Sequence, residues 1–473
     1  MSDLMAFDVV VVGSGPAGQK AAIQAAKAGK RACVVEQEAD VGGACVHRGT
    51  IPSKTLRETA RHMCELRRRL GRNVKIEIPR DVQLASLMER VENVVAAHVE
   101  FQSRQLKRNG VAHVHGRARF VDPHTLEVTT TRRETRRLRG DLVMIATGSR
   151  PRCPDGVPVD HENVYDSDSI LSMAYLPQSL TVLGGGVIAT EYATIFAALG
   201  VRVTMIDRAA RPLAFLDAEL TDRLRDAFER HEGCVYVPAA KVAEVVWNGV
   251  DRVITSLANG WVIESEKMLC ALGRVANLDG LAIERAGLVV DGSGHLAVDQ
   301  DGRTSAPHIF AVGDVAGPPA LASAAMEQGR RAARAAFDLP RPDRSDLIPV
   351  GVYALPEIGS VGVDESAAIA SGFDVVVGRA NFAEIARGHI NGIEDGLLKL
   401  VVDASTRRIL GCQIVGEGAT ELVHVAQMAM TNDAEADLFC DRIFNFPTMA
   451  EAYRVAALDA IGKIAARQAP AAS

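Results

Sequence analysis

The sequence predicts an α/β protein that contains two copies of one nucleotide-binding unit. Residues 8–36 read as a strand, a glycine turn, an alanine-rich helix, a second strand and a terminal acid, and residues 179–207 repeat that order. Two such units in register, each placed between a strand and a helix, predict two dinucleotide-binding domains of the Rossmann type, whereas one alone would be weak evidence. Their landmarks keep one offset of 171 residues: Gly13 and Gly184, Gly15 and Gly186, Gly18 and Ala189, Glu36 and Asp207.

Each landmark of the repeated unit has a physical role. The first glycine makes a tight turn, the second lets the backbone approach a pyrophosphate, and the third small residue lets the helix pack closely on the strand. The N-terminus of the helix faces the phosphates. The terminal acid accepts hydrogen bonds from a ribose diol and repels a 2′-phosphate. After Asp207 come Arg208 and Arg211, which are either surface arginines or partners of a 2′-phosphate; this mixed signal suits a site for both NAD and NADP.

The composition indicates an ordinary globular chain of roughly three domains, at about 150 residues each. The hydrophobic content is 48%, and the net charge of −6 gives no basic surface for nucleic acid or anionic lipid. The eight cysteines are scattered without a CxxC pair or metal-like spacing, so we expect reduced thiols and no metal site. Because the first residues lack a basic signal segment and the valine run at 9–12 is too short for a membrane span, we expect a cytoplasmic protein.

A short segment after the first unit carries a family resemblance. Residues 42–54 read Gly-Gly-Ala-Cys-Val-His-Arg-Gly-Thr-Ile-Pro-Ser-Lys and resemble the active-site segment of the FAD-dependent class-I pyridine nucleotide-disulfide oxidoreductases. In that family two cysteines form a redox disulfide beside FAD. Here Cys45 fills the first position, but Thr50 fills the second, and a hydroxyl can form neither a disulfide nor a thiolate. We therefore expect the frame of a disulfide reductase without its dithiol.

The resemblance extends over essentially the whole chain and implies which nucleotide each unit binds. The first unit would bind FAD through Gly13, Gly15, Gly18 and Glu36. The other residues implied for FAD are Cys45, Thr50, Lys54, Thr147, Gly148, Gly313 and Asp314, of which Asp314 resembles the aspartate that binds the ribityl chain. The residues implied for NAD or NADP are Gly184, Gly186, Ala189, Asp207, Arg208, Arg211 and Gly273.

The same resemblance divides the chain into domains. It implies an FAD-binding domain at 1–150 that resumes at 277–345, an NAD(P)-binding domain at 151–276, and an α+β interface domain for dimerisation at 346–473. The composition at 339–348 is that of a linker. We expect a homodimer or a larger homo-oligomer.

Two charged residues resemble the family's flavin-side pair. Lys54, held by Glu191, would place a cation near flavin N5 and stabilise the negative charge of a reduced flavin, so we expect both to be catalytic. Phe446 stands where the family has its histidine base, and it cannot transfer a proton. With thiolate and base both missing, thiol–disulfide chemistry is not expected. Cys45 is then either a redox-active thiol or a small apolar filler near the flavin.

The expected reaction follows from what is left. FAD would face only a nicotinamide site, which predicts the exchange NADPH + NAD⁺ = NADP⁺ + NADH by ping-pong hydride transfer through flavin N5. Within the family, the resemblance is to the soluble (Si-specific) pyridine nucleotide transhydrogenases, and it is carried by Thr50 together with residues 165–171, 213–217 and 447–457. The alternatives are an NAD(P)H diaphorase or quinone reductase and a low-turnover flavin redox sensor.

Overall fold

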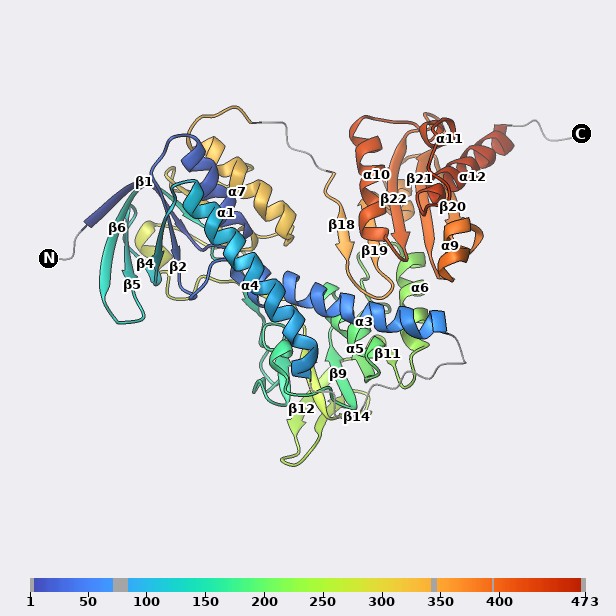
Figure 1. Ribbon diagram of the computed structural model, residues 1–473, viewed down its shortest axis with the longest axis horizontal. Coiled ribbons are helices and arrows are strands. Elements are labelled where there is room, and N and C mark those ends of the chain that lie inside the picture. Colours follow the sequence, from blue (N-terminus) through green and yellow to red (C-terminus); the bar gives the residue numbers. More distant parts are fainter. Residues whose placement is uncertain (1–3, 71–83, 342–346, 394, 469–473) are drawn as a thin grey trace, which may run out of the picture.

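The computed structural model describes residues 4–70, 84–341, 347–393 and 395–468, which fold into three lobes (Figure 1). Each lobe is built on one main β-sheet. The two repeated units lie in the N-terminal and central lobes, and the last part of the chain forms the C-terminal lobe. This arrangement confirms the predicted fold class, an α/β chain with two Rossmann-like domains and a C-terminal α+β domain.

The N-terminal lobe contains a seven-stranded sheet in which the valine run of β1 is fully buried at its centre. β1 pairs in parallel with β2 on one side and β6 on the other, as the predicted strand–helix–strand unit requires. The helices α1 (Pro16–Lys27) and α7 (Ala322–Ala336) pack together. The strands are β1 (Leu4–Val12), β2 (Ala32–Glu36), β3 (Ala112–His115), β4 (Arg117–Asp122), β5 (Thr125–Thr129), β6 (Thr135–Ile145) and β17 (Ile309–Ala311).

The central lobe repeats the unit in a five-stranded parallel sheet, ordered β11-β10-β9-β15-β8, with the helix α5 (Val187–Ala198) after the second glycine turn. A three-stranded antiparallel sheet of β12, β13 and β14 adjoins it. The chain passes between the first two lobes through the antiparallel pair β7 (Ser149–Pro151) and β16 (Arg274–Ala276). The remaining elements are β8 (Val164–Asp166), β9 (Ser179–Leu183), β10 (Arg202–Ile206), α6 (Ala218–Glu229), β11 (Val235–Val237), β12 (Val242–Trp247), β13 (Val253–Leu257), β14 (Val262–Ser265) and β15 (Lys267–Cys270).

The C-terminal lobe is an antiparallel sheet ordered β18-β19-β22-β21-β20, with the helices α10 and α12 packed on it. Its core holds the fully buried rings of Phe382 and Tyr453. The strands are β18 (Val350–Val352), β19 (Ile358–Gly362), β20 (Val375–Asn381), β21 (Leu397–Asp403) and β22 (Ile409–Val415). The helices are α8 (Glu365–Ala370), α9 (Ala386–Asn391), α10 (Ala419–Thr431), α11 (Asp437–Asp441) and α12 (Glu451–Gln468).

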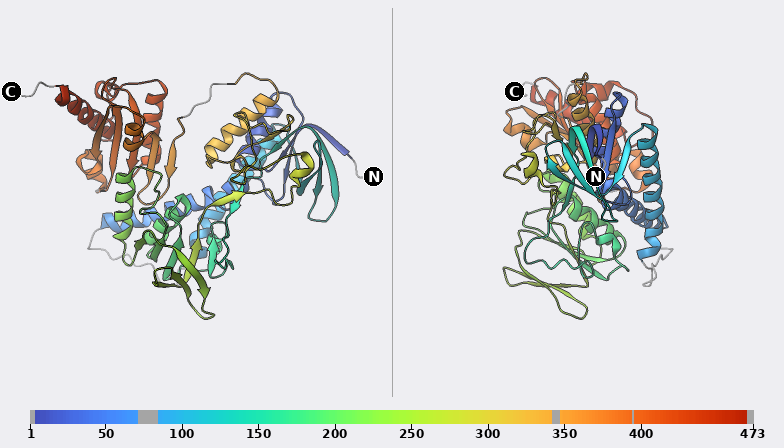
Figure 2. Two further views of the ribbon diagram at one scale, coloured as in Figure 1. Left: turned by 180° about the vertical axis from the view of Figure 1, so that it is seen from behind. Right: turned by 90° about the vertical axis from the view of Figure 1, so that its left-hand side faces the viewer.

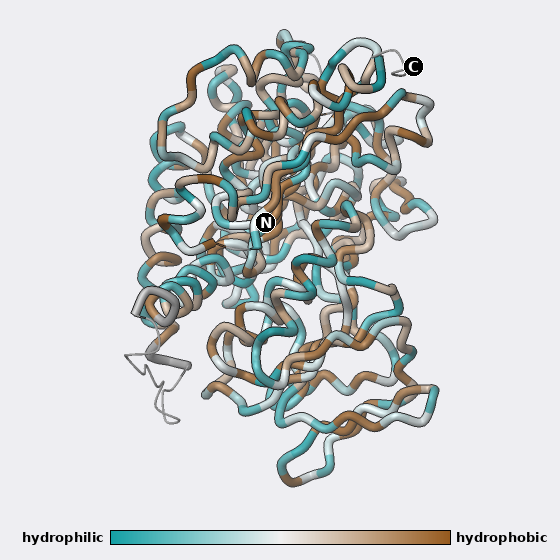
Figure 3. The backbone as a smooth tube through the Cα atoms, turned by 90° about the vertical axis from the view of Figure 1, so that its right-hand side faces the viewer, coloured by the Kyte–Doolittle hydropathy of each residue, from teal (hydrophilic) through white to brown (hydrophobic). Residues whose placement is uncertain are grey.

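Two long helices connect the lobes and position the site. α3 (Thr50–Leu70) begins in the active-site-like segment and packs through Leu56 and Ala60 against α5 of the central lobe, while α4 (Leu84–Arg108) packs along α3. The views from behind and from the side show both helices running between the lobes (Figure 2). Hydrophobic stretches follow the strands inside the lobes, and hydrophilic stretches are frequent in the outer turns (Figure 3).

The predicted domain boundaries near 150 and 276 fall next to β7 and β16, and they stay predictions, as does the boundary at 345, which lies outside the described residues. The linker predicted at 339–348 is described only at its two ends. Among the helices in the described part of the chain, none combines the length and apolar character needed to cross a membrane.

Candidate active site

A cavity of about 850 Å³ lies where the three lobes meet. Its walls come from the first glycine turn, the segment 43–54, the N-terminal part of α5, the turn after β17 and one face of α10. The residues implied for FAD that line it are Gly13, Gly15, Glu36, Cys45, Thr50, Lys54, Thr147, Gly148, Gly313 and Asp314. Gly18 packs behind the turn, where an added Cβ would lie 2.0 Å from the Gly13 carbonyl oxygen, so a side chain there would push α1 off β1.

The acid that ends the first unit is fixed by the glycine turn. Glu36 is buried, and its Oε2 accepts hydrogen bonds from the Ser14 backbone N–H at 2.8 Å and the Ser14 hydroxyl at 2.6 Å. Its Oε1 accepts from the Glu38 N–H at 3.0 Å. The segment 42–54 closes over this turn, since a Cβ on Gly43 would lie 2.9 Å from the Gly15 Cα. Strand end, turn and segment therefore form one rigid wall.

Two buried hydroxyl groups in the cavity wall lack hydrogen-bond partners among the described residues. They are the Thr147 Oγ1 and the Tyr192 hydroxyl. Buried polar groups almost always have a partner, so an unpaired pair of hydroxyls in one wall fits a polar ligand. Nearby, Asp314 accepts a hydrogen bond from Ser149 Oγ through its Oδ2 at 2.6 Å, and Ser149 also lines the cavity. This donor and acceptor set fits FAD, which carries hydroxyl, phosphate and ring nitrogen groups.

Cys45 has a hydroxyl neighbour in place of a second sulfur. It lies on the short helix α2 (Gly43–His47), and the Thr50 side chain at the start of α3 hydrogen-bonds to its sulfur. Burial raises the pKa of the Cys45 thiol, and the Thr50 hydrogen bond and the Lys54 charge offset only part of that rise. Cys45 is therefore a neutral thiol at neutral pH, which suits a filler better than a nucleophile. All eight cysteines lie in described residues, and no disulfide joins any of them.

The structure brings Lys54 of α3 and Glu191 of α5 together at the cavity wall. The Lys54 Nζ lies 2.5 Å from Glu191 Oε2, with the carboxylate side chain 5% exposed and the lysine side chain 27% exposed. Glu191 Oε1 accepts a hydrogen bond from the Tyr353 backbone N–H at 2.9 Å, and the Lys54 Nζ lies 5.1 Å from the centre of the Tyr353 ring. The catalytic roles of Lys54 and Glu191 stay predictions, but the geometry holds one cation at a fixed place in the cavity.

Sequence reasoning missed a charged network that joins the N-terminal and central lobes. Arg274 donates to Asp168 Oδ1 at 2.7 Å and to Ser149 Oγ at 2.9 Å, so it connects to Asp314 through one serine. Arg48, at the rim, lies 3.9 Å from the other oxygen of Asp168. Gly273, which precedes Arg274, and Asp314 were predicted from the sequence, but nothing there indicated that Arg274, Asp168 and Ser149 lie together, because these residues are far apart in the sequence.

The residues implied for the adenosine end of NAD or NADP lie outside the lining of this cavity. Asp207 Oδ1 accepts from the Arg208 N–H at 2.8 Å, and Tyr236 places its hydroxyl 3.4 Å from Oδ2. Arg208 is exposed, and the buried Nε of Arg211 has no hydrogen-bond partner among the described residues. Sequence reasoning missed Tyr236, which comes from the neighbouring strand β11. These groups lie together, and their role as the adenosine end of a second site stays a prediction.

The other residues predicted for NAD or NADP are three glycines and one alanine, which affect the course of the backbone at and near the second glycine turn. Gly184 has a φ of +121°, where a side chain would be strained, and its added Cβ would meet the Ala271 carbonyl oxygen at 2.6 Å. Gly186 and Gly273 leave open space around them, and Ala189 lies 3.7 Å from that added Cβ of Gly184. The N-terminal part of α5 then reaches the shared cavity through Val187, Ile188 and Glu191. The second unit thus leads from Asp207 toward the same cavity as the first.

Phe446, at the position of the family's histidine, does not line the cavity of its own chain. Its side chain is 72% exposed, and the neighbouring Ile443 is 96% exposed. The Glu451 Oε2 is buried without a hydrogen-bond partner in the described structure. Two large exposed apolar side chains next to the C-terminal lobe are typical of a surface that another chain covers.

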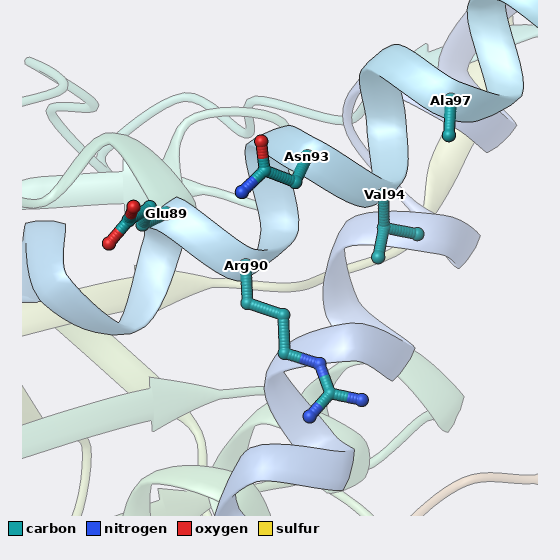
Figure 4. A pocket seen from close by; sticks show the side chains of 5 residues that line it. All are labelled: Glu89, Arg90, Asn93, Val94 and Ala97. Atoms are coloured by element: carbon teal, nitrogen blue, oxygen red, sulfur yellow. The ribbon is translucent and has the colours of Figure 1, made fainter.

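A second hollow, of about 400 Å³, lies along α4 and is unrelated to these sites (Figure 4). Its lining comes from this one helix: Glu89, Arg90, Asn93, Val94 and Ala97. It contains no glycine turn and no cysteine. No group of three or more histidine, cysteine or acidic side chains placed to hold a metal ion occurs within the described residues.

Comparisons with known proteins match nearly the whole chain. The model of the pyridine nucleotide-disulphide oxidoreductases matches residues 7–329, and the model of their dimerisation domain matches residues 348–457. The soluble pyridine nucleotide transhydrogenase of Mycobacterium tuberculosis (strain ATCC 25177 / H37Ra) is 41% identical over 461 residues, covering 97% of this chain and 98% of the relative. The transhydrogenase of the same name from Colwellia psychrerythraea is 38% identical, with the same coverage.

Solved structures with the same fold cover nearly all of the chain as well. LpdA from Mycobacterium tuberculosis superimposes with a TM-score of 0.87 at 28% identity, covering 96% of this chain and 99% of that chain. The HOCl-induced flavoprotein disulfide reductase RclA from Escherichia coli superimposes with a TM-score of 0.86 at 26% identity, covering 95% and 99%.

Proposed function

The chain belongs to the pyridine nucleotide-disulphide oxidoreductase family, and from this membership we propose that it exchanges hydride between NADPH and NAD⁺ through FAD. The observation that carries the proposal is a cavity that keeps the Lys54–Glu191 pair but has Thr50 in contact with the single Cys45. A flavin site with its cation and without a second sulfur can pass hydride but not disulfide electrons. The names of the transhydrogenases at 38–41% identity support this choice.

FAD would occupy the shared cavity. The first glycine turn and Glu36 would hold its ADP half, because the turn permits close approach of the pyrophosphate and the carboxylate can accept from a ribose diol. Asp314 would hold the ribityl hydroxyls. Thr147 and Tyr192 supply buried hydroxyl groups that lack other partners among the described residues.

The protein's own contribution to the reaction is electrostatic and steric. FAD bound in this cavity would supply a flavin that can carry a hydride between two nicotinamides binding in turn, which implies ping-pong order. Lys54 places a positive charge in the cavity, and Glu191 fixes the position of that charge. Val187 presents a small side chain at the start of α5, where it leaves the nicotinamide approach open. Cys45 stays a neutral neighbour.

Dual nucleotide use would be set at the end of β10. Asp207 is oriented by the Arg208 N–H and the Tyr236 hydroxyl, and in this position it can accept from the 2′-hydroxyl of NAD. Arg208 and Arg211 could then turn toward a 2′-phosphate of NADP, and the unpaired Nε of Arg211 supports that role. One site would thus serve both substrates in turn.

The assembly would be a homodimer. The match to a dimerisation domain over residues 348–457 supports a homo-oligomer, and the exposed Ile443 and Phe446 lie within that region. A partner chain that covers them would bring Phe446 to the partner's cavity, where a phenyl ring excludes water and transfers no proton.

Steady-state kinetics test the proposal. NADPH is varied at several fixed concentrations of thionicotinamide-NAD⁺, whose reduced form absorbs at a distinct wavelength. Parallel lines in double-reciprocal plots are expected, because the first product leaves before the second substrate binds. Lipoamide and glutathione disulfide should give no oxidation of NADPH. Intersecting lines, or turnover with either disulfide, would refute the proposal.

A further inference from the structure

The loop that leads from β18 to β19 in the C-terminal lobe is held by a helix of the central lobe. The Tyr353 N–H donates to Glu191 Oε1 at 2.9 Å, and the Leu355 N–H donates to Thr194 Oγ1 at 3.2 Å. Glu191 and Thr194 are neighbouring positions on one face of α5. The loop is therefore aligned on α5 by two backbone hydrogen bonds.

The same loop is tied to α3, the helix that carries Lys54. Arg57 and Glu357 are both buried and lie 3.4 Å apart, and the Arg57 guanidinium also donates to the Ala354 carbonyl oxygen at 3.4 Å. Arg57 lies three residues after Lys54, about one helical turn. Both helices that supply the lysine–glutamate pair thus contact one loop of a third lobe.

Tyr353 is the residue of this loop that contacts both members of the pair. Glu191 uses one carboxylate oxygen for Lys54 and the other for the Tyr353 N–H, so the backbone of the loop fixes the rotation of the carboxylate. The Lys54 ammonium faces the Tyr353 ring at 5.1 Å, within the range of a cation–π contact. Tyr353, Lys54 and Glu191 all line the cavity.

The ring and the carboxylate leave Lys54 little freedom. A cation–π contact at a partly buried site favours the contacting rotamer by about three- to tenfold. Without the ring, the ammonium gains rotamers that carry it away from Glu191 or toward water, because its side chain is 27% exposed. The positive charge of Lys54 would then occupy several positions in the cavity, and on average it would lie farther from a bound flavin.

From this arrangement we propose that Tyr353 is a positioning residue that fixes the Lys54–Glu191 pair, and that its aromatic ring, not its hydroxyl, does so. The proposal rests on the proposed function only in assuming that FAD binds in the cavity. By this proposal the C-terminal lobe helps to place the charges of the site, since it supplies both the Tyr353 N–H that Glu191 accepts and the Tyr353 ring that Lys54 contacts.

The test compares Tyr353→Leu, Tyr353→Met and Tyr353→Phe as FAD-loaded proteins. Leucine and methionine remove the ring, whereas phenylalanine keeps the ring and removes only the hydroxyl. The flavin midpoint potential is measured by anaerobic dye titration, and the rate of flavin reduction by NADPH is measured without an acceptor. Leu and Met should shift the ratio of oxidised to reduced flavin about three- to tenfold toward the oxidised form, or about 15 to 30 mV for a two-electron couple.

The control is Thr194→Val, which removes the hydrogen bond to the Leu355 N–H and the hydroxyl's own bonds to the backbone carbonyl oxygens of Thr190 and Glu191. It leaves the side-chain contacts of Lys54 and Glu191 in place. It should lower thermal stability and leave the midpoint potential at the wild-type value. The proposal is overturned if Tyr353→Leu or Tyr353→Met, loaded with FAD, keeps the wild-type midpoint potential. It is also overturned if Tyr353→Phe shifts the midpoint potential as much as the two ring-free variants do. Both readouts are independent of NAD⁺, so a failure of reoxidation by NAD⁺ would count against the proposed function alone.

Discussion

Lys54 and Glu191 should contribute to the free energy of unfolding in a coupled way, so that the effect of substituting one depends on the presence of the other. A double-mutant cycle measures that coupling. In Lys54→Met, the Glu191 carboxylate keeps its hydrogen bond from the Tyr353 N–H but loses the Lys54 ammonium, whose Nζ lies 2.5 Å from Glu191 Oε2. The carboxylate side chain is only 5% exposed, so water cannot replace the lost partner easily. Breaking a fully buried pair costs about 3 to 5 kcal/mol. Because the Lys54 side chain is 27% exposed, we expect about 2 to 3 kcal/mol.

The second arm of the cycle is Glu191→Gln. Its side-chain oxygen can still accept from the Tyr353 N–H, and Lys54 loses a charged partner but can turn toward solvent, since its side chain is 27% exposed. We expect a loss of about 1 kcal/mol. In the double variant no buried charge is left unpaired, so its loss should be smaller than the sum of the two single losses by about 1 to 2 kcal/mol.

Urea unfolding of the apoprotein and of the FAD-loaded protein, followed by intrinsic fluorescence, gives the four free energies of unfolding. The wild type and all three variants must show the same dependence on urea for the comparison to hold. If the single losses add to within about 0.5 kcal/mol of the double loss, the pair is not coupled and the electrostatic reasoning is wrong.

Three further outcomes are expected. Arg208→Ala combined with Arg211→Ala should lower kcat/KM for NADPH about tenfold or more and leave kcat/KM for NADH unchanged, since each charge-assisted hydrogen bond to a phosphate contributes about 1.5 to 3 kcal/mol. An equal loss with both nucleotides, or no loss, would contradict the phosphate role of the two arginines. Thr50→Cys should lose two titratable thiols on mild oxidation, because residue 50 already contacts the Cys45 sulfur; an unchanged thiol count would show that the two side chains do not meet. Burial raises the pKa of Cys33 from 9.0 to about 12, so between those pH values the unfolded thiol ionises first, and Cys33 lowers the free energy of unfolding by up to about 1.4 kcal/mol per pH unit. Other buried thiols act in the same direction, so urea unfolding should show a shallower dependence on pH in Cys33→Ala, and an unchanged dependence would contradict the burial effect.

The repeated units could be predicted from the sequence because their signals are local. The glycine turns, the helices after them and the strand-end acids each lie within about 30 residues, and packing needs at Gly18 and Gly184 impose small residues there. The fold class followed from the two units together with the resemblance of the C-terminal part. The position of Thr50 beside Cys45 could also be predicted, because both lie in one short segment, while its role stays a prediction.

The contacts between lobes could not be predicted in the same way. The hydrogen bond between Ser149 and Asp314 joins residues 165 positions apart, and the contact between Tyr353 and Glu191 joins residues 162 positions apart. Neither partner carries a local pattern that distinguishes it from an ordinary serine or tyrosine. These contacts exist because β7, β17 and the loop after β18 converge on one cavity, which only the tertiary structure shows.

Thr50 and Lys54 differ in how the rest of the structure holds them. Thr50 starts α3 and lies beside the Cys45 sulfur. Lys54 is fixed by groups from two other lobes, so its removal would leave Glu191 without its ion-pair partner.

The most direct measurement is stopped-flow spectroscopy of the FAD-loaded protein. The flavin is first reduced anaerobically with NADPH, and the reduced protein is then mixed with NAD⁺ or, separately, with a quinone. With NAD⁺, oxidised flavin absorbance should return rapidly, together with one equivalent of NADH per flavin. A flavin that stays reduced with NAD⁺ but is reoxidised by the quinone would contradict hydride exchange with NAD⁺ and identify a quinone reductase instead.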